Sequence, residues 1–124
     1  MTQDYYGTKR ISAWEDDRDG KPGYAVKYAD GYISWSPKAV FEEAYQPITA
    51  MSFGHAVEAL KAGHRVARAG WNGKGMWLDL QVPDINSKMS LPYIFMFTAD
   101  AHRVPWLASQ TDVLAADWAI MAAN

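Results

Sequence analysis

The 124-residue chain contains no cysteine. Disulfides, thiolate nucleophiles, iron–sulfur clusters and the usual structural zinc sites are therefore excluded. The three histidines, His55, His64 and His102, do not share the spacing of metal ligands either. We accordingly expect neither a metal site nor a cofactor.

Long apolar runs and an excess of charge of one sign are also missing. The longest apolar stretch, around Ile94–Phe97, is far shorter than the ~20 residues of a membrane helix. The first residues, Met1–Tyr6, are polar and lack the apolar run of a signal peptide. We therefore expect a cytoplasmic protein with no membrane partner. Twelve basic and fourteen acidic residues give a formal charge of -2, which argues against a DNA or RNA polymer as partner.

Recognisable catalytic motifs are absent as well. There is no Gly-x-Ser-x-Gly elbow, and the turn Gly73–Gly75 is too short for a phosphate-binding loop and lacks its following Ser or Thr. A hydrolase that uses Asp112, Asp117 or His102 is an alternative without positive support, because the sequence alone brings no two of these groups together.

Hydrophobic periodicity predicts an α+β fold in two segments, residues 1–48 and 49–124. In the first segment we expect a β-hairpin and a helix. The elements are a strand near 11–14, hairpin strands at 24–28 and 32–35 around Asp30-Gly31, and a helix that Ser36 caps, Pro37 opens and Pro47 ends.

In the second segment we expect a helix packed on a mostly antiparallel sheet. Ser52 is the predicted N-cap of this helix, and Gly63 is its predicted stop. The predicted strands are 64–69, 76–82, 93–97, 103–106 and 117–121. Ser109 to Asp112 resembles a capping box, with Asp in place of Glu or Gln, and predicts a short helical turn.

The six tryptophans are unusual for so short a chain. Trp77 and Trp118 lie on predicted strands and are interpreted as core residues. Trp71 in a glycine-rich turn and Trp106 after Pro105 lie outside any apolar stripe, so either ring could stack on a nucleotide base, pack in the core or form an interface.

Residues near these tryptophans in sequence could complete a small pocket. Arg65 and Arg68 can pair with phosphate, and a helix N-terminus at Ser109 offers backbone amides. Asn72, Asp112 and Asp117 could read ribose hydroxyls or base edges, although Asp112 could equally be only a helix cap. The residues alone predict an α+β domain with an aromatic pocket or interface.

Three stretches carry a family resemblance. Met51–Met76, Leu91–Ile94 and Val104–Trp118 resemble, in order, a small phage and prophage domain that is associated with the second type of Thoeris anti-defence protein. The resemblance covers roughly residues 50 to 121 and rests on two long motifs.

The resemblance implies a non-catalytic sponge, not an enzyme. Such proteins bind a cyclic ADP-ribose isomer, and some relatives hold cyclic dinucleotides, as homotetramers with pockets at subunit interfaces. The expected location is the cytoplasm of the infected or lysogenic bacterial host. Trp71 and Trp106 are then the candidates for adenine stacking, Arg65 or Arg68 for phosphate, and the polar contacts are Asn72, Ser109, Thr111 and Asp112.

The first 48 residues extend beyond this domain. Tyr6–Lys9 and Gly31–Tyr45 resemble another phage-encoded segment to which we can attach no function. The extension could cover a pocket, alter oligomer contacts or add a second site. Besides the sponge, a nucleotide hydrolase and a protein-interaction module without a small ligand stay open as alternatives.

Overall fold

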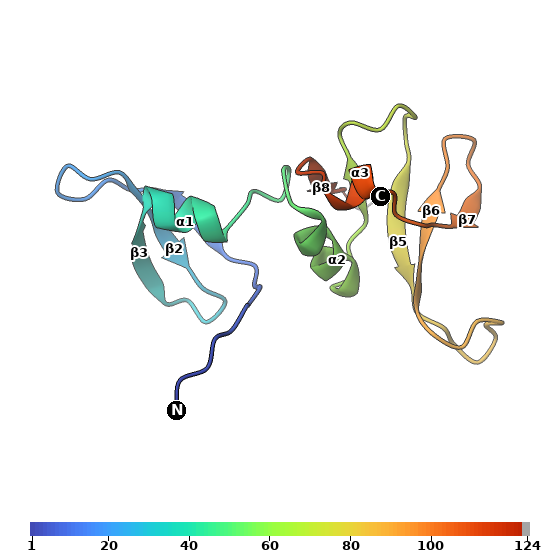
Figure 1. The fold of residues 1–124 in the computed structure, drawn as a ribbon, viewed down its shortest axis with the longest axis horizontal. Coiled ribbons are helices and arrows are strands. Elements are labelled where there is room, and N and C mark those ends of the chain that lie inside the picture. The colour runs from blue at the N-terminus through green and yellow to red at the C-terminus, as the bar shows by residue number, and fades with distance from the viewer. Residues whose placement is uncertain (123–124) are drawn as a thin grey trace. The chain divides into compact units, whose positions relative to one another are not determined.

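The computed structural model describes residues 1–122 and divides the chain into two compact units, Met1–Gln46 and Pro47–Asn124. Each unit has its own sheet, and every strand pair in both sheets is antiparallel (Figure 1). Helices accompany each sheet, which confirms the predicted α+β class.

The first unit is a three-stranded meander followed by one helix, in the order β1-β2-β3. Its elements are β1 (Ser12–Glu15), β2 (Gly23–Lys27), β3 (Ile33–Pro37) and α1 (Lys38–Ala44). The predicted cap at Ser36 is wrong, because β3 continues to Pro37, which is the N-cap and makes no side-chain cap bond. The Ser36 hydroxyl instead donates to the Pro37 carbonyl at 3.2 Å.

Few residues of the first unit are fully buried, so contacts between aromatic side chains are important for its packing. The Trp35 ring lies so close to Gly23 that a Cβ there would overlap it, and the Trp35 Nε1 donates to the Asp16 carbonyl at 2.6 Å. On α1, Phe41 stacks on Tyr24 with ring centroids 4.1 Å apart. Gly23 is therefore required by a close approach of a ring.

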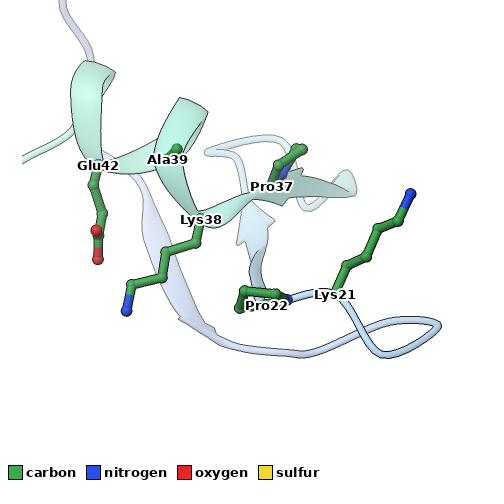
Figure 2. A pocket seen from close by; sticks show the side chains of 6 residues that line it. All are labelled: Lys21, Pro22, Pro37, Lys38, Ala39 and Glu42. Atoms are coloured by element: carbon green, nitrogen blue, oxygen red, sulfur yellow. The ribbon is translucent and has the colours of Figure 1, made fainter.

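An open hollow of about 480 Å³ lies beside the start of α1. Two lysines, two prolines, an alanine and a glutamate line it, and Figure 2 shows them: Lys21, Pro22, Pro37, Lys38, Ala39 and Glu42. The Glu42 carboxylate is already engaged, since it accepts a hydrogen bond from the Tyr24 hydroxyl at 2.7 Å.

The second unit is a five-stranded sheet in the order β7-β6-β5-β4-β8. Its elements are α2 (Phe53–Lys61), β4 (Val66–Arg68), β5 (Trp77–Gln81), β6 (Tyr93–Phe97), β7 (Arg103–Pro105), α3 (Gln110–Val113) and β8 (Trp118–Ile120). All seven lie within a few residues of their predicted positions. The last strand of the chain, β8, pairs with β4 at one edge of the sheet, and the β6–β7 hairpin forms the other edge (Figure 1).

Helix α2 covers one face of this sheet. Its N-cap is Ser52, as predicted, and the Ser52 hydroxyl accepts from the amide of His55 at 3.3 Å. Gly63 follows the helix with φ +95°, a conformation that suits glycine. The buried core between helix and sheet comprises Met51, Ala56, Ala59, Leu60, Val66, Leu78 and Trp118.

Strand alternation turns Trp77 away from this core. Leu78 is fully buried beneath α2, so its neighbour Trp77 faces the opposite side, which we call the outer face. The interpretation of Trp118 as a core residue is confirmed, since it is 0% exposed. The same interpretation of Trp77 is wrong, because a strand with one buried face cannot bury both Leu78 and Trp77 on it.

The outer face carries two stacked rings flanked by two arginines. The register aligns Trp77, Phe97 and Arg103 across three strands. The two rings are stacked with centroids 4.8 Å apart and planes 7° apart. The Arg65 guanidinium lies 4.0 Å from the Trp77 centroid, and that of Arg103 lies 5.4 Å from the Phe97 centroid. We call these four side chains the outer stack, and it protects apolar surface by ring stacking and cation–π contacts.

The outer stack predicts an uneven response to truncation. Phe97→Ala removes the ring between Trp77 and Arg103 and should lower the free energy of unfolding by about 2 kcal/mol. Val82→Ala, at a residue 65% exposed just beyond β5, should change it by less than about 0.5 kcal/mol. Urea denaturation followed by circular dichroism measures both, and equal losses would contradict a stabilising role for the stack.

Candidate functional site

Arg68 forms the centre of a polar cluster on the α2 side of the sheet. It lies at the end of β4, directly opposite Trp118 of β8. Its Nη1 donates to Asp112 Oδ1 at 2.9 Å, and its Nε donates to Asp117 Oδ1 at 2.8 Å. Only 19% of the Arg68 side chain is exposed. One guanidinium therefore joins residues 44 and 49 positions away in sequence.

Asp112 connects this ion pair to the short helix α3. The predicted capping box is present: the Ser109 hydroxyl accepts from the amide of Asp112 at 3.1 Å, and Asp112 Oδ2 accepts from the amide of Ser109 at 3.4 Å. The same carboxylate accepts from Trp71 Nε1 at 3.1 Å. The Asp112 carbonyl accepts from Trp118 Nε1 at 2.9 Å. Asp112 is thus both a helix cap and the anchor of two indole groups.

Asp117 holds the turn that carries Trp71. Its Oδ2 accepts from the amide of Gly70 at 2.7 Å, while its Oδ1 faces Arg68. A Cβ at Gly70 would lie 2.9 Å from that carboxylate, so a side chain at residue 70 would crowd this contact. The backbone before Trp71 and the indole of Trp71 are therefore fixed by two different carboxylates of one cluster.

The charges of the cluster stabilise one another. Burial works to raise the pKa of Asp112, but hydrogen bonds from Arg68, Trp71 and Ser109 outweigh it and leave that pKa below its ordinary value. The hydrogen bond from Arg68 likewise lowers the pKa of Asp117. In return, the two carboxylates raise the pKa of Arg68. Both aspartates are ionised at neutral pH, and the three groups together carry one negative charge.

Three indoles and one phenyl ring form the wall of the cluster. Trp71 and Trp106 both meet the buried Trp118 edge-on, with centroids 5.4 Å and 6.1 Å away and interplanar angles of 82° and 83°. Phe53 of α2 packs against Trp106 and Trp118 at 6.1 Å and 5.4 Å. Trp71 and Trp106 are half-buried and Trp118 is fully buried, so the outer two rings retain exposed surface.

Most of the predicted site residues are brought to this cluster. They are Arg68, Trp71, Trp106, Ser109, Thr111 and Asp112. Asn72 follows Trp71 in the same turn and is exposed. Thr111 belongs to the capping turn, where its hydroxyl lies 2.8 Å from that of Ser109.

Arg65 is the predicted site residue that lies elsewhere. It is three residues before Arg68, so strand alternation turns it to the outer face, where it stacks on Trp77 and lies 3.9 Å from Asp79. Arg65 and Arg68 of one chain therefore do not converge on one phosphate. Sequence reasoning missed both this parity and the bond between Asp117 and Gly70, which only the pairing of β4 with β8 creates.

Of the three residues of the hydrolase alternative, Asp112 and Asp117 meet at Arg68, whereas His102 lies elsewhere. His102 lies in the turn before β7, where it is 73% exposed and 3.3 Å from Asp100. Asp112 and Asp117 are engaged by Arg68, and their lowered pKa values disfavour the protonated form that a general acid needs. Within residues 1–122 no group of three or more acidic or histidine side chains could hold a metal ion. Over the same residues no helix is long and apolar enough to cross a membrane.

Comparison with known proteins matches this second unit. The model of the Thoeris anti-defense 2-like domain matches residues 51–121, which is more than half of the chain. The chain belongs to this family. The match includes the whole Arg68 cluster and the outer stack and leaves the first unit outside. A relative named Thoeris anti-defense 2, from Bacillus phage SP01, is 45% identical over an 86-position alignment, and the match covers 59% of this chain and 97% of the relative.

The Arg68 cluster predicts a pH-dependent loss of stability. Arg68→Met leaves two carboxylates without their cation and should lower the free energy of unfolding at pH 7 by about 2–3 kcal/mol. Both aspartate pKa values are lowered in the folded state. The stabilisation is therefore complete above the unfolded value of about 3.9 and is lost as the pH falls through the lower folded values.

The difference between wild type and Arg68→Met should consequently shrink as the pH is lowered from 7 to 3. Urea denaturation at pH 7, 4 and 3 measures it. Arg68→Lys is the matched control, because it keeps the charge and loses the fork, and it should lie between the two. A difference that does not change with pH would contradict this account of the cluster.

Proposed function

We propose that the second unit binds a cyclic nucleotide immune signal, a cyclic ADP-ribose isomer, and sequesters it without cleaving it. Membership of the Thoeris anti-defense 2 family supports an anti-defence role of a phage protein. The observation that carries the finer proposal is the pair of half-buried indoles, Trp71 and Trp106, each packed edge-on against the buried Trp118. Rigid rings lose little entropy when a flat base stacks on them.

Polar groups suited to a ribose or a base edge lie beside these rings. Asn72 follows Trp71 in an exposed turn, and the hydroxyls of Ser109 and Thr111 lie at the start of α3. Asp112 already accepts hydrogen bonds from Arg68, Trp71 and Ser109, so its main contribution is to hold Trp71 in place. In this proposal Asp112 and Arg68 are positioning residues, and Asn72 and Thr111 contact the ligand.

The phosphates of the proposed ligand need a positively charged partner. In a single chain the Arg68 cluster offers none, because its one arginine is already paired. Arg68 is bound to two carboxylates, and Arg65 lies on the outer face. A homotetramer with pockets between subunits resolves this, because a neighbouring subunit can present Arg65 to a ligand held by Trp71. Cyclic dinucleotides share the base and phosphate chemistry and are the natural second ligand class. Action in the host cytoplasm, where such signals are soluble, belongs to the same proposal.

Base stacking predicts which substitutions weaken binding. Trp71→Ala and Trp106→Ala should each weaken binding of a cyclic ADP-ribose isomer by roughly 5- to 150-fold, the equivalent of about 1–3 kcal/mol per stacked base. Trp71→Phe keeps a flat ring and should lose less. Trp14→Ala, at an exposed ring of the first unit, is the matched control and should bind normally. Isothermal titration calorimetry gives each affinity, and unchanged binding in both alanine variants would remove this pocket from consideration.

Sequestration also predicts the fate of the ligand. After incubation with a cyclic ADP-ribose isomer and heat denaturation of the protein, chromatography should recover the intact ligand in stoichiometric amount. Linear ADP-ribose that increases with time of incubation would establish the hydrolase alternative instead. Absence of binding to any cyclic nucleotide, together with a folded protein by circular dichroism, would favour the interaction module.

A further inference from the structure

A second hollow lies on the outer face, at the edge formed by β7. Its volume is about 100 Å³. The side chains that line it come from three neighbouring strands: Gln81 of β5, Tyr93 and Phe95 of β6, and Arg103, Val104 and Pro105 of β7. None of these six residues is acidic. This hollow is separate from the Arg68 cluster, which lies on the α2 side of the sheet.

Arg103 gives the hollow a positive charge without a counterion. Arg103 is exposed. Its guanidinium makes no ion pair with any residue in the described range 1–122. Its neighbours are the rings of Phe97, at 5.4 Å, and Trp77, at 6.0 Å. A guanidinium beside aromatic rings loses little hydration by staying there and keeps its N–H donors available to an anion.

Two further hydrogen-bond donors line the same hollow. Tyr93 is half-buried, and its hydroxyl has no hydrogen-bond partner among residues 1–122. The Gln81 amide donates only a long hydrogen bond of 3.4 Å, to the Val82 carbonyl. Phe95, only 9% exposed, supplies an apolar wall that limits access of water. Donors of this kind beside an apolar wall favour a group that accepts several hydrogen bonds.

The size of the hollow limits its occupant. About 100 Å³ is the space of roughly three water molecules. A carboxylate or phosphate group fits that space, whereas a complete nucleotide does not. A planar oxyanion also matches the fork of a guanidinium, which can donate two parallel hydrogen bonds to it.

We propose that this hollow is a binding site for a small oxyanion, a carboxylate or a phosphate group, held by the Arg103 guanidinium with Tyr93 and Gln81 as additional donors. Within one chain this site is separate from the Arg68 cluster, because the two lie on opposite faces of one sheet. Its occupant is either a free anion or the anionic end of a larger molecule whose remainder lies outside the hollow.

The test is a titration of the full chain with acetate and, separately, with inorganic phosphate at constant ionic strength. Nuclear magnetic resonance should show saturable shifts of the Arg103 Nε–H and of the amides of residues 81, 93 and 103–105. Preference for one of the two probes identifies the chemistry of the natural group. Arg103→Gln should weaken binding at least tenfold, and Tyr93→Phe about threefold.

Lys88→Gln is the matched control, since it removes one exposed positive charge from the loop between β5 and β6, outside the hollow. It should bind either probe like the wild type. Shifts that do not saturate, or that are the same in Arg103→Gln, would overturn the proposal. Shifts of these amides with protein concentration and not with added anion would also overturn it, because they would show that a second copy of the chain, and not an anion, occupies the hollow. Titration of Arg103→Gln with a cyclic ADP-ribose isomer tests the nucleotide pocket separately. Loss of anion binding with unchanged binding of the cyclic nucleotide would show that the two sites are distinct.

Discussion

The fork of Arg68 between Asp112 and Asp117 determines the arrangement of the α2 side of the second unit. It joins the end of β4 to α3 and to the residue before β8, three segments that are far apart along the chain. Asp112 caps α3 and accepts the Trp71 indole, while Asp117 fixes Gly70. A lysine offers no rigid fork with which to satisfy both carboxylates. The position of Trp71, on which the proposed pocket rests, therefore depends on one guanidinium.

The spacing of two arginines divides the sheet into two surfaces of different character. Arg65 and Arg68 are three residues apart at β4, so they lie on opposite faces. On the α2 side the cation is neutralised by carboxylates, and the indoles meet edge-on around Trp118. On the outer face the cations lie beside stacked rings, and among residues 1–122 only Asp79 forms an ion pair with one of them, at 3.9 Å from Arg65. The same residue types thus build a fixed polar cluster on one side and an exposed cationic surface on the other.

Local patterns in the sequence account for most of the fold and for most of the residues of the candidate site, but not for the bonds that join them. The helical stripe after Ser52, the stop at Gly63 and the capping box at Ser109 are short-range signals, and the structure contains all three. Trp77 was misassigned because size and hydrophobicity favour burial, whereas alternation with Leu78 decides which face a strand residue occupies. The bonds from Arg68 to Asp112 and Asp117 depend on the long-range pairing of β4 with β8. No local pattern encodes that pairing.

The hydrogen bonds already made by Asp112 separate positioning from recognition in the proposed pocket. A carboxylate has about four lone-pair sites, and Asp112 uses three of them for Arg68, Trp71 and the Ser109 amide. A ligand that competed for these contacts would release Trp71, so tight binding requires polar groups that the fold does not use. The exposed Asn72 side chain, beside Trp71, is such a group. Within the described part of the chain, the Thr111 hydroxyl at the start of α3 contacts only the Ser109 hydroxyl, at 2.8 Å, and so keeps hydrogen-bonding capacity for a ligand. The Trp71 ring and the polar groups beside it can therefore bind the same ligand only while the Arg68 cluster remains intact.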